Sequence, residues 1–426
     1  MRGGEKMRVT VYPAKKSGSV VIPPSKSVAH RAIIASCLAD GASIIRNVSE
    51  SEDMKATIRA MEALGAKIVR DGDTLKIHGM NGVPKKEAVT AECGESGSTL
   101  RFLIPLFSLC GGDVTFIGSK RLMERPQDVY ETLFEKQGLS FARGERLKLH
   151  GAVCGGELII RGDISSQFIT GLLFTLPLLD RDSVIHILPP FESASYVKLT
   201  LRVLESFGIR AEFSDTYTLF IPGNQTYQPR DYTVEGDFSQ LAFWAVRGAI
   251  GAKTVCAGVD LKSEQGDKVI LDHIAQVGAD VSVADKTAVI LPGALRFAKI
   301  DLADCPDLGP VLTVLGAFCQ GGMRIMNAGR LRIKESDRIE AMETELLKLG
   351  VDIESDENSI TVHGRMPMTA PVTVYAHNDH RIAMSLAVFA ASAEQPVTIE
   401  GAECVKKSYP DFFEVLESTG VTVIYE

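Results

Sequence analysis

Six apolar segments of the sequence begin with hydroxyl-bearing or charged residues, and these beginnings hold most of the side chains that could do chemistry. If the segments are helices, their free backbone N–H groups and the helix dipole favour anions. Lys or Arg at a helix start opposes the dipole, which points to an anionic ligand. Ser and Asp there are more often plain caps, and each site taken alone leaves that alternative open. The residues concerned are Lys26, Ser27, Arg31, Ser96, Gly97, Ser98, Ser165, Ser166, Gln167, His380 and Arg381.

Two further segments concentrate charge. The first, RLRIKESDRIEAM, contains Lys334, Glu335, Asp337 and Arg338. A solvated, ion-paired helix start is an alternative interpretation of it. The second, KRLMERPQDV, places Arg125 before a proline, as at a loop or helix start. His377 and His380 are three residues apart, but no Cys or Glu cluster completes a coordination shell, so no metal is expected.

The elements that must position these residues form a repeat of about 70 residues. An amphipathic run, a glycine and an apolar-polar-apolar phrase recur together, which predicts a helix ended by glycine and then a strand. A second strand follows, and the apolar helix precedes each unit. The six glycines are Gly65, Gly138, Gly208, Gly278, Gly350 and Gly420.

Six apolar helices cannot all lie at the centre of one compact body, so we expect two domains of three repeats each. A helix that is apolar all round belongs inside a core, which predicts an α/β fold with buried helices inside and sheets outside, like an inverse α/β barrel. The predicted domains are residues 21–236, and residues 1–20 together with 237–426. The strand Arg8 to Tyr12 is expected to complete the sixth repeat. The chain then crosses twice between domains, which makes a hinge.

The composition sets broad limits on function. The chain has 426 residues, 45% apolar and 23% charged, with a net charge of −8, which excludes disorder and small disulfide scaffolds. The acidic balance argues against nucleic-acid and anionic-membrane binding. Eight cysteines without a Cys-x-x-Cys pair indicate reduced thiols. We found neither a signal peptide nor an apolar stretch of the ~20 residues that span a bilayer, so a cytoplasmic protein is expected.

Eight phrases in order, from about residue 20 to about residue 420, resemble the 5-enolpyruvylshikimate-3-phosphate (EPSP) synthase family. They are PSKSVAHR, ESGSTLR, ERPQD, ISSQFITGLL, DCPDLGP, IKESDRIEAM, NDHRIAM and KKSYPDFF. The resemblance implies two domains of three βαβαββ units that close around shikimate 3-phosphate and phosphoenolpyruvate. It also implies enolpyruvyl transfer to the 5-hydroxyl with release of phosphate, by addition and elimination through a tetrahedral intermediate. No cofactor is expected, and we expect a monomer because no apolar stripe is left over.

The resemblance also assigns residues to roles. It places Asp307 as acceptor of the 5-hydroxyl proton and Glu335 at the proton of the methylene carbon, with Lys26 also catalytic. Shikimate 3-phosphate is assigned to Lys26, Ser27, Arg31, Ser165, Ser166, Gln167, Ser193, Tyr196, Asp307 and Lys334. Phosphoenolpyruvate is assigned to Lys26, Gly97, Arg125, Gln167, Arg338, Arg381 and Lys407.

Three positions depart from the pattern of many family members. Glu95 replaces an Asn and is left out of the substrate list, Arg330 replaces a polar residue and is a weak phosphate candidate, and Phe102 replaces Pro or Leu. The segment MRGGEK before Met7 has no counterpart. Two alternatives are weighed: the sister transferase acting on UDP-N-acetylglucosamine, whose loop Cys and Gly-Ala-Lys-Asn phrase are missing here, and a non-catalytic repeat scaffold.

Overall fold

The computed structural model describes residues 7–426, so the segment MRGGEK lies outside the described residues. The chain divides into two compact units. Unit 1 contains Met1–Pro23 and Gly236–Glu426, and unit 2 contains Pro24–Glu235. These boundaries lie three residues and one residue from those expected from the repeats. That each unit behaves as a domain in solution stays a prediction.

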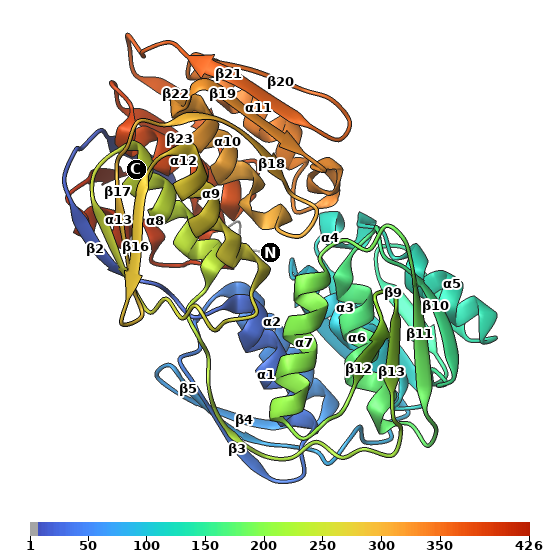
Figure 1. Ribbon diagram of the computed structural model, residues 1–426. Coiled ribbons are helices and arrows are strands. Elements are labelled where there is room, and N and C mark those ends of the chain that lie inside the picture. The colour runs from blue at the N-terminus through green and yellow to red at the C-terminus, as the bar shows by residue number, and fades with distance from the viewer. Residues whose placement is uncertain (1–6) are drawn as a thin grey trace. The chain divides into compact units, whose positions relative to one another are not determined.

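Unit 2 contains three repeats, labelled in Figure 1. The first has α1 (Lys26–Leu38), β3 (Ala42–Arg46), α2 (Glu52–Leu64), β4 (Lys67–Asp71) and β5 (Thr74–His78). The second has β6 (Ala88–Gly94), α3 (Gly97–Ser108), β7 (Asp113–Gly118), α4 (Lys120–Glu124), α5 (Asp128–Lys136), β8 (Ser140–Ala142) and β9 (Leu147–His150). The third has β10 (Glu157–Arg161), α6 (Ser166–Thr175), η1 (Leu176–Leu178), β11 (Ser183–Leu188), α7 (Ala194–Ser206), β12 (Glu212–Asp215) and β13 (Thr218–Ile221), and β14 (Asp231–Thr233) follows.

Unit 1 begins with β1 (Arg8–Tyr12) and β2 (Gly18–Val21) and continues with three repeats. The fourth has α8 (Phe238–Ile250), β15 (Thr254–Ala257), η2 (Gly266–Val269), α9 (Ile270–Val277), β16 (Asp280–Ala284) and β17 (Thr287–Leu291). The fifth has β18 (Arg296–Asp301), η3 (Pro306–Leu308), α10 (Gly309–Phe318), β19 (Gln320–Met326), η4 (Gly329–Ile333), α11 (Arg338–Lys348), β20 (Val351–Ser355) and β21 (Ile360–Arg365). The sixth has β22 (Val372–Tyr375), α12 (His380–Ser392), β23 (Val397–Glu400), η5 (Ala402–Lys407), α13 (Phe412–Ser418) and β24 (Thr422–Tyr425).

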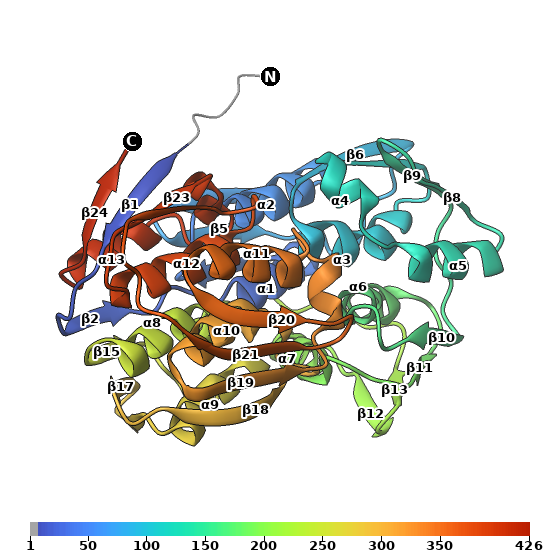
Figure 2. The same cartoon turned by 90° about the horizontal axis from the view of Figure 1, so that it is seen from above.

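Every repeat contributes to one four-stranded sheet, and three of the sheets borrow a strand from elsewhere in the chain. In the sheet β6-β7-β9-β8, the strands β6 and β7 on either side of the buried helix are parallel, and β9 is antiparallel to both β7 and β8. β14 pairs in parallel with β3, and β2 pairs in parallel with β15. β1 lies between β23 and β24, as Figure 2 shows, so the role predicted for Arg8 to Tyr12 in the sixth repeat is confirmed.

The two kinds of helix differ in burial as their sequences require. In α1 all residues from Val28 to Leu38 are buried, and α8 is buried almost throughout, because both are apolar on every side. The amphipathic helices bury one face only, as α2 does. Each is followed by one of the six predicted glycines at positive φ, from 70° at Gly138 to 134° at Gly65, where other residues are strained.

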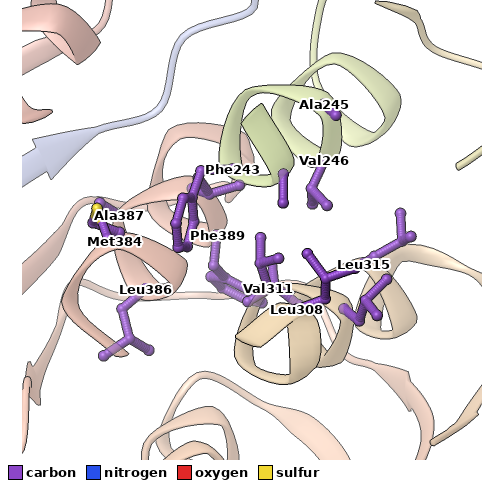
Figure 3. Packing of buried hydrophobic residues seen from close by; sticks show 14 of the residues in the cluster. Phe243, Ala245, Val246, Leu308, Val311, Leu315, Met384, Leu386, Ala387 and Phe389 are labelled. Atoms are coloured by element: carbon purple, nitrogen blue, oxygen red, sulfur yellow. The ribbon is translucent and has the colours of Figure 1, made fainter. Parts of the chain in front are cut away.

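The hydrophobic core consists of two separate clusters, one in each unit. In unit 1 the three apolar helices α8, α10 and α12 pack on one another through Phe243, Val311, Leu315 and Phe389 (Figure 3). Burying each such side chain is worth roughly 1.5–3 kcal/mol. The helix starts are thereby fixed close together, with the site residues on them. No helix among the described residues is long and apolar enough to cross a membrane.

Candidate active site

Unit 2 fixes its first basic residue with a carboxylate from the neighbouring helix. Ser25 caps α1 by accepting a hydrogen bond from the amide of Val28. Lys26 follows as the first helical residue, and its Nζ lies 2.8 Å from Oδ2 of Asp53 on α2. Asp53 is buried, so this ion pair holds the ammonium group in one place at the helix start.

Arg31, one turn further along α1, is buried without a carboxylate partner among the described residues. Its Nε donates to Oγ1 of Thr200 at 2.8 Å, and its guanidinium also donates to the carbonyls of Ser27 and Tyr196 at 2.8 and 3.1 Å. The guanidinium lies 5.0 Å from the centre of the Phe102 ring. Burial lowers the pKa of Arg31 to about 10, so it is still charged at neutral pH. Uncompensated charge of this kind suits an anion receptor.

The start of α3 lies beside Arg125. A Cβ added at Gly97 would come within 2.5 Å of the Arg125 guanidinium, so this position needs the absence of a side chain. Gln167 at the start of α6 donates to Oγ of Ser98 at 3.0 Å and accepts from Arg101 at 3.0 Å. These contacts tie the beginnings of two buried helices together.

The remaining predicted residues of unit 2 stand at the starts of α6 and α7. Ser165 caps α6, and Ser166 is its first residue. Ser193 precedes α7 in the left-handed conformation, and the Tyr196 carbonyl accepts from Arg31. Unit 2 therefore brings together ten predicted residues, which lie at or near helix starts except for Arg125 at the C-terminal end of α4. They are Lys26, Ser27, Arg31, Gly97, Arg125, Ser165, Ser166, Gln167, Ser193 and Tyr196.

Unit 1 gathers cations around a single carboxylate. Asp307 in η3 lies 2.9 Å from Arg381 and 3.0 Å from Arg338, and its Oδ1 lies 3.9 Å from Nζ of Lys334. Glu335 pairs with the same Arg338 at 2.9 Å. All five residues were predicted, and the structure joins them in one network of ion pairs.

Two buried acidic groups anchor this network. Asp379, which is fully buried, accepts from Nε of Arg338 at 2.8 Å and caps α12 through the amide of Arg381. The Arg381 guanidinium also donates to Oγ of Ser239, which in turn donates to Asp237. Asp237 caps α8, so the starts of α8, α11 and α12 are connected through polar side chains.

The ion pairs shift the pKa values in opposite directions. Burial alone would raise the pKa of Asp307, but Arg381, Lys334 and Arg338 lower it by more, so it lies well below its ordinary range. Burial lowers the pKa of Lys334 to about 8, against the attraction of Asp307. Burial would also lower the pKa of Arg338, but Asp379, Glu335 and Asp307 raise it above its ordinary value. Asp307 is therefore ionised, and Lys334 is the one of these groups that titrates near neutrality.

The last predicted residue, Lys407 at the end of η5, reaches the loop before α12. Its Nζ donates to the carbonyl of Asn378, next to Asp379. Arg330, the weak phosphate candidate, lies in η4 and donates to the carbonyl of Ala303 at 2.5 Å. His377 is bound to Glu345 at 2.8 Å rather than to His380, and within residues 7–426 no group of His, Cys, Asp and Glu is placed to hold a metal.

Cations at helix starts do not all require an external anion, contrary to what the sequence predicts. Lys26, Arg338 and Arg381 have carboxylates of the protein as partners, namely Asp53, Asp379 and Asp307. Among the cations discussed, the prediction holds for Arg31, which contacts hydroxyls and carbonyls. Sequence reasoning missed Asp53 and Asp379. Asp379 could have been found, because Asp is a common N-cap residue and Asp379 directly precedes the apolar segment that begins at His380.

Comparisons with known proteins show the family of the chain. A family model described as EPSP synthase (3-phosphoshikimate 1-carboxyvinyltransferase) matches residues 12–416. The chain belongs to the EPSP synthase family. The family expected from the eight phrases is thereby confirmed. The description of this family fits neither of the two alternatives, the sister transferase and the non-catalytic repeat scaffold.

Two relatives of the EPSP synthase family cover nearly the whole chain, and both are named 3-phosphoshikimate 1-carboxyvinyltransferase. The protein from Clostridium kluyveri is 43% identical over 415 residues, covering 97% of each chain. The protein from Clostridium perfringens is 44% identical over 417 residues, covering 97% of this chain and 98% of the relative.

Solved structures support the same fold. The EPSP synthase from Acinetobacter baumannii superposes with a TM-score of 0.81 at 25% identity, covering 99% of this chain and 100% of that one. The enolpyruvyl transferase NikO from Streptomyces tendae gives a TM-score of 0.79 at 18% identity over 99% of both chains, which shows the fold alone. The predicted α/β class is confirmed.

Proposed function

We propose that the chain transfers the enolpyruvyl group of phosphoenolpyruvate to the 5-hydroxyl of shikimate 3-phosphate and releases inorganic phosphate, as a 3-phosphoshikimate 1-carboxyvinyltransferase of the shikimate pathway. The observation that carries the proposal is the network around Asp307. A carboxylate held by Arg338, Arg381 and Lys334, with Glu335 on the same arginine, supplies two acid-base groups among cations.

The first half of the reaction is an addition. The 5-hydroxyl oxygen bonds to the central carbon of phosphoenolpyruvate while its proton passes to Asp307, and the methylene carbon gains a proton from Glu335. In the free protein Asp307 is a weak base because three cations depress its pKa. Anionic groups of phosphoenolpyruvate that share Arg338 and Arg381 raise that pKa, so binding itself activates the base.

The second half is an elimination. The new methyl group returns a proton to Glu335, the bond between the central carbon and the phosphate oxygen breaks, and phosphate departs with the proton that Asp307 had accepted. Preorganised cations stabilise the charge that develops on phosphate. We assign this role to Lys26, Arg125, Arg338, Arg381 and Lys407, with Gly97 and Gln167 also at phosphoenolpyruvate.

Recognition of shikimate 3-phosphate is assigned to hydroxyls and to Arg31. The buried guanidinium meets the phosphate, and its bonds to Thr200 and Tyr196 fix its orientation beforehand. The remaining groups assigned to this substrate are Lys26, Ser27, Ser165, Ser166, Gln167, Ser193, Tyr196, Asp307 and Lys334. Domain closure on both substrates, a cytoplasmic location and a monomeric state stay predictions. Scattering curves with and without the substrates test the closure.

One assay tests the function. The purified full chain, given shikimate 3-phosphate and phosphoenolpyruvate in buffer with a chelator, is expected to release inorganic phosphate and to form the enolpyruvyl ether. Each substrate alone serves as a control. Phosphate release with UDP-N-acetylglucosamine but not with shikimate 3-phosphate would contradict the proposal.

A further inference from the structure

The loop between β22 and α12 contains two consecutive residues in an unfavourable backbone conformation. His377 and Asn378 both have φ of 51°, in the left-handed region that side chains other than glycine rarely adopt. Such strain persists only where surrounding contacts over-determine the backbone. The contacts that hold this loop in its strained conformation therefore indicate its role.

Helix α11 holds the loop at both of its ends. Arg338, the first residue of α11, binds Asp379 at 2.8 Å. Glu345, seven residues later and so on the same helix face, accepts from Nε2 of His377 at 2.8 Å and from the amide of Tyr375 at 3.0 Å. The strained pair lies between these two anchors.

Glu345 is a buried hydrogen-bond acceptor. Its side chain is only 1% exposed, and the ammonium of Lys348, which is 45% exposed, also lies 2.7 Å from it. Burial raises the pKa of Glu345, but the hydrogen bonds from His377, Lys348 and the Tyr375 amide lower it by more, so the group is ionised at neutral pH. The Tyr375 and His377 rings lie 5.1 Å apart, which packs the anchor from one side.

The loop between β22 and α12 contacts or orients three cations of unit 1. The Asn378 carbonyl accepts from Lys407, and Asp379 orients Arg338 and caps the helix that begins with His380 and Arg381. A shift of the left-handed pair would move both the carbonyl and the cap. Lys407, Arg338 and Arg381 are the three cations of unit 1 that we assign to phosphoenolpyruvate.

We propose that Glu345 and His377 are a positioning pair for phosphoenolpyruvate: their hydrogen bond locks the left-handed turn that sets Lys407, Arg338 and Arg381. This inference rests on the proposed function. Neither residue is assigned to a substrate or to the reacting atoms. Their effect passes through the backbone of residues 377–379.

The test separates the hydrogen bond from the backbone preference. His377→Gly relieves the left-handed strain but removes the donor, whereas His377→Gln keeps a donor that reaches Glu345 and keeps the strain. We expect His377→Gly to raise KM for phosphoenolpyruvate roughly tenfold, as loss of a hydrogen bond to a charged group does, and to leave KM for shikimate 3-phosphate within about twofold. We expect His377→Gln to restore KM for phosphoenolpyruvate to within about threefold.

Lys348→Met is the matched control, because it removes an exposed partner of the same carboxylate and leaves the loop anchor intact. Its KM values are expected to equal those of the unchanged protein, whose activity tests the proposed function separately. An unchanged KM for phosphoenolpyruvate in His377→Gly would overturn the inference. Equal rises in both KM values, together with a lower unfolding temperature in both His377 variants, would also overturn it by showing a merely structural role.

Discussion

Two buried arginines, one in each unit, are held in opposite ways. Arg31 in unit 2 donates to the hydroxyl of Thr200 and to backbone carbonyls, whereas Arg338 in unit 1 is surrounded by Asp307, Glu335 and Asp379. Burial lowers the pKa of Arg31 to about 10, while the three carboxylates raise the pKa of Arg338 despite its burial. One guanidinium therefore keeps an unbalanced charge, and the other is compensated.

The two environments suit different tasks. That of Arg31 suits the binding of an anion, and that of Arg338 suits proton transfer by the neighbouring carboxylates. An unbalanced, oriented guanidinium gains most when an anionic phosphate arrives, because no protein carboxylate has to be displaced. A compensated network responds differently, since an arriving anion shares the cations and frees the carboxylates to accept protons. We therefore expect substitution of Arg31 to affect binding and substitution of Asp307 to affect turnover.

The largest expected effect is on turnover in unit 1. Asp307→Asn removes the proton acceptor, and kcat is expected to fall by ~10²- to 10⁴-fold, the usual contribution of a general base. KM for shikimate 3-phosphate should change far less, because the amide keeps the shape of the side chain. Steady-state kinetics of both substrates measure this split. Glu335→Gln is expected to behave in the same way, while Asp280→Asn, on an exposed strand position, serves as the control.

Full turnover in Asp307→Asn would remove this residue from the mechanism. A rise in KM without a fall in kcat would instead place Asp307 among the binding groups. Either result would contradict the expected division of roles, in which Arg31 acts in binding and Asp307 in turnover.

The second effect is on binding in unit 2. Arg31→Met keeps an unbranched apolar stem beside Phe102 but removes the guanidinium, so KM for shikimate 3-phosphate is expected to rise by about 10²-fold, as for a lost charge-assisted contact. The value of kcat at saturation should fall much less. Arg202→Met, an exposed arginine of the same unit, is the control. A turnover defect equal to that of Asp307→Asn would contradict the assignment of Arg31 to binding.

A smaller effect is expected where geometry rather than charge is changed. In Gly97→Ala the new methyl group would lie 2.5 Å from the Arg125 guanidinium, which has to move. KM for phosphoenolpyruvate is expected to rise by roughly 10-fold or somewhat more, the value of one displaced ionic hydrogen bond. Gly144→Ala is a suitable control, because its nearest neighbour to an added Cβ is 3.9 Å away. An unchanged KM would show that Arg125 acts elsewhere.

Most of the fold could be predicted from the sequence because its signals are local. Buried helices such as α1 are apolar all round, and glycines such as Gly65 end the amphipathic ones. Counting repeats also placed β1 in the sixth repeat. The exchange of β2 and β14 between repeats was not predicted, since strands of four and three residues carry too little alternation to be recognised.

The candidate site could also be predicted only in part. Many residues of the site stand at or near helix starts, and their positions followed from motifs. Their partners did not, because Lys26 meets Asp53 and Arg31 meets Thr200 only after distant helices pack. The sequence shows that a cation is present, but whether it is compensated depends on tertiary contacts. That property distinguishes Arg31 from Arg338.

The smallest effect concerns Lys334, a cation of the Asp307 network. Burial lowers the pKa of Lys334 to about 8, so it is charged below that pH and loses its proton as the pH rises through it. The value of kcat/KM for shikimate 3-phosphate should therefore fall between pH 7 and 9, by at most about tenfold, because about a tenth of Lys334 is charged at pH 9. At saturation the bound phosphate raises this pKa, so kcat should be less sensitive. In Lys334→Arg the side chain stays charged over this range, so the fall in kcat/KM should disappear. A fall that persists would assign the titration to another group and would mean that Lys334 keeps its charge up to pH 9.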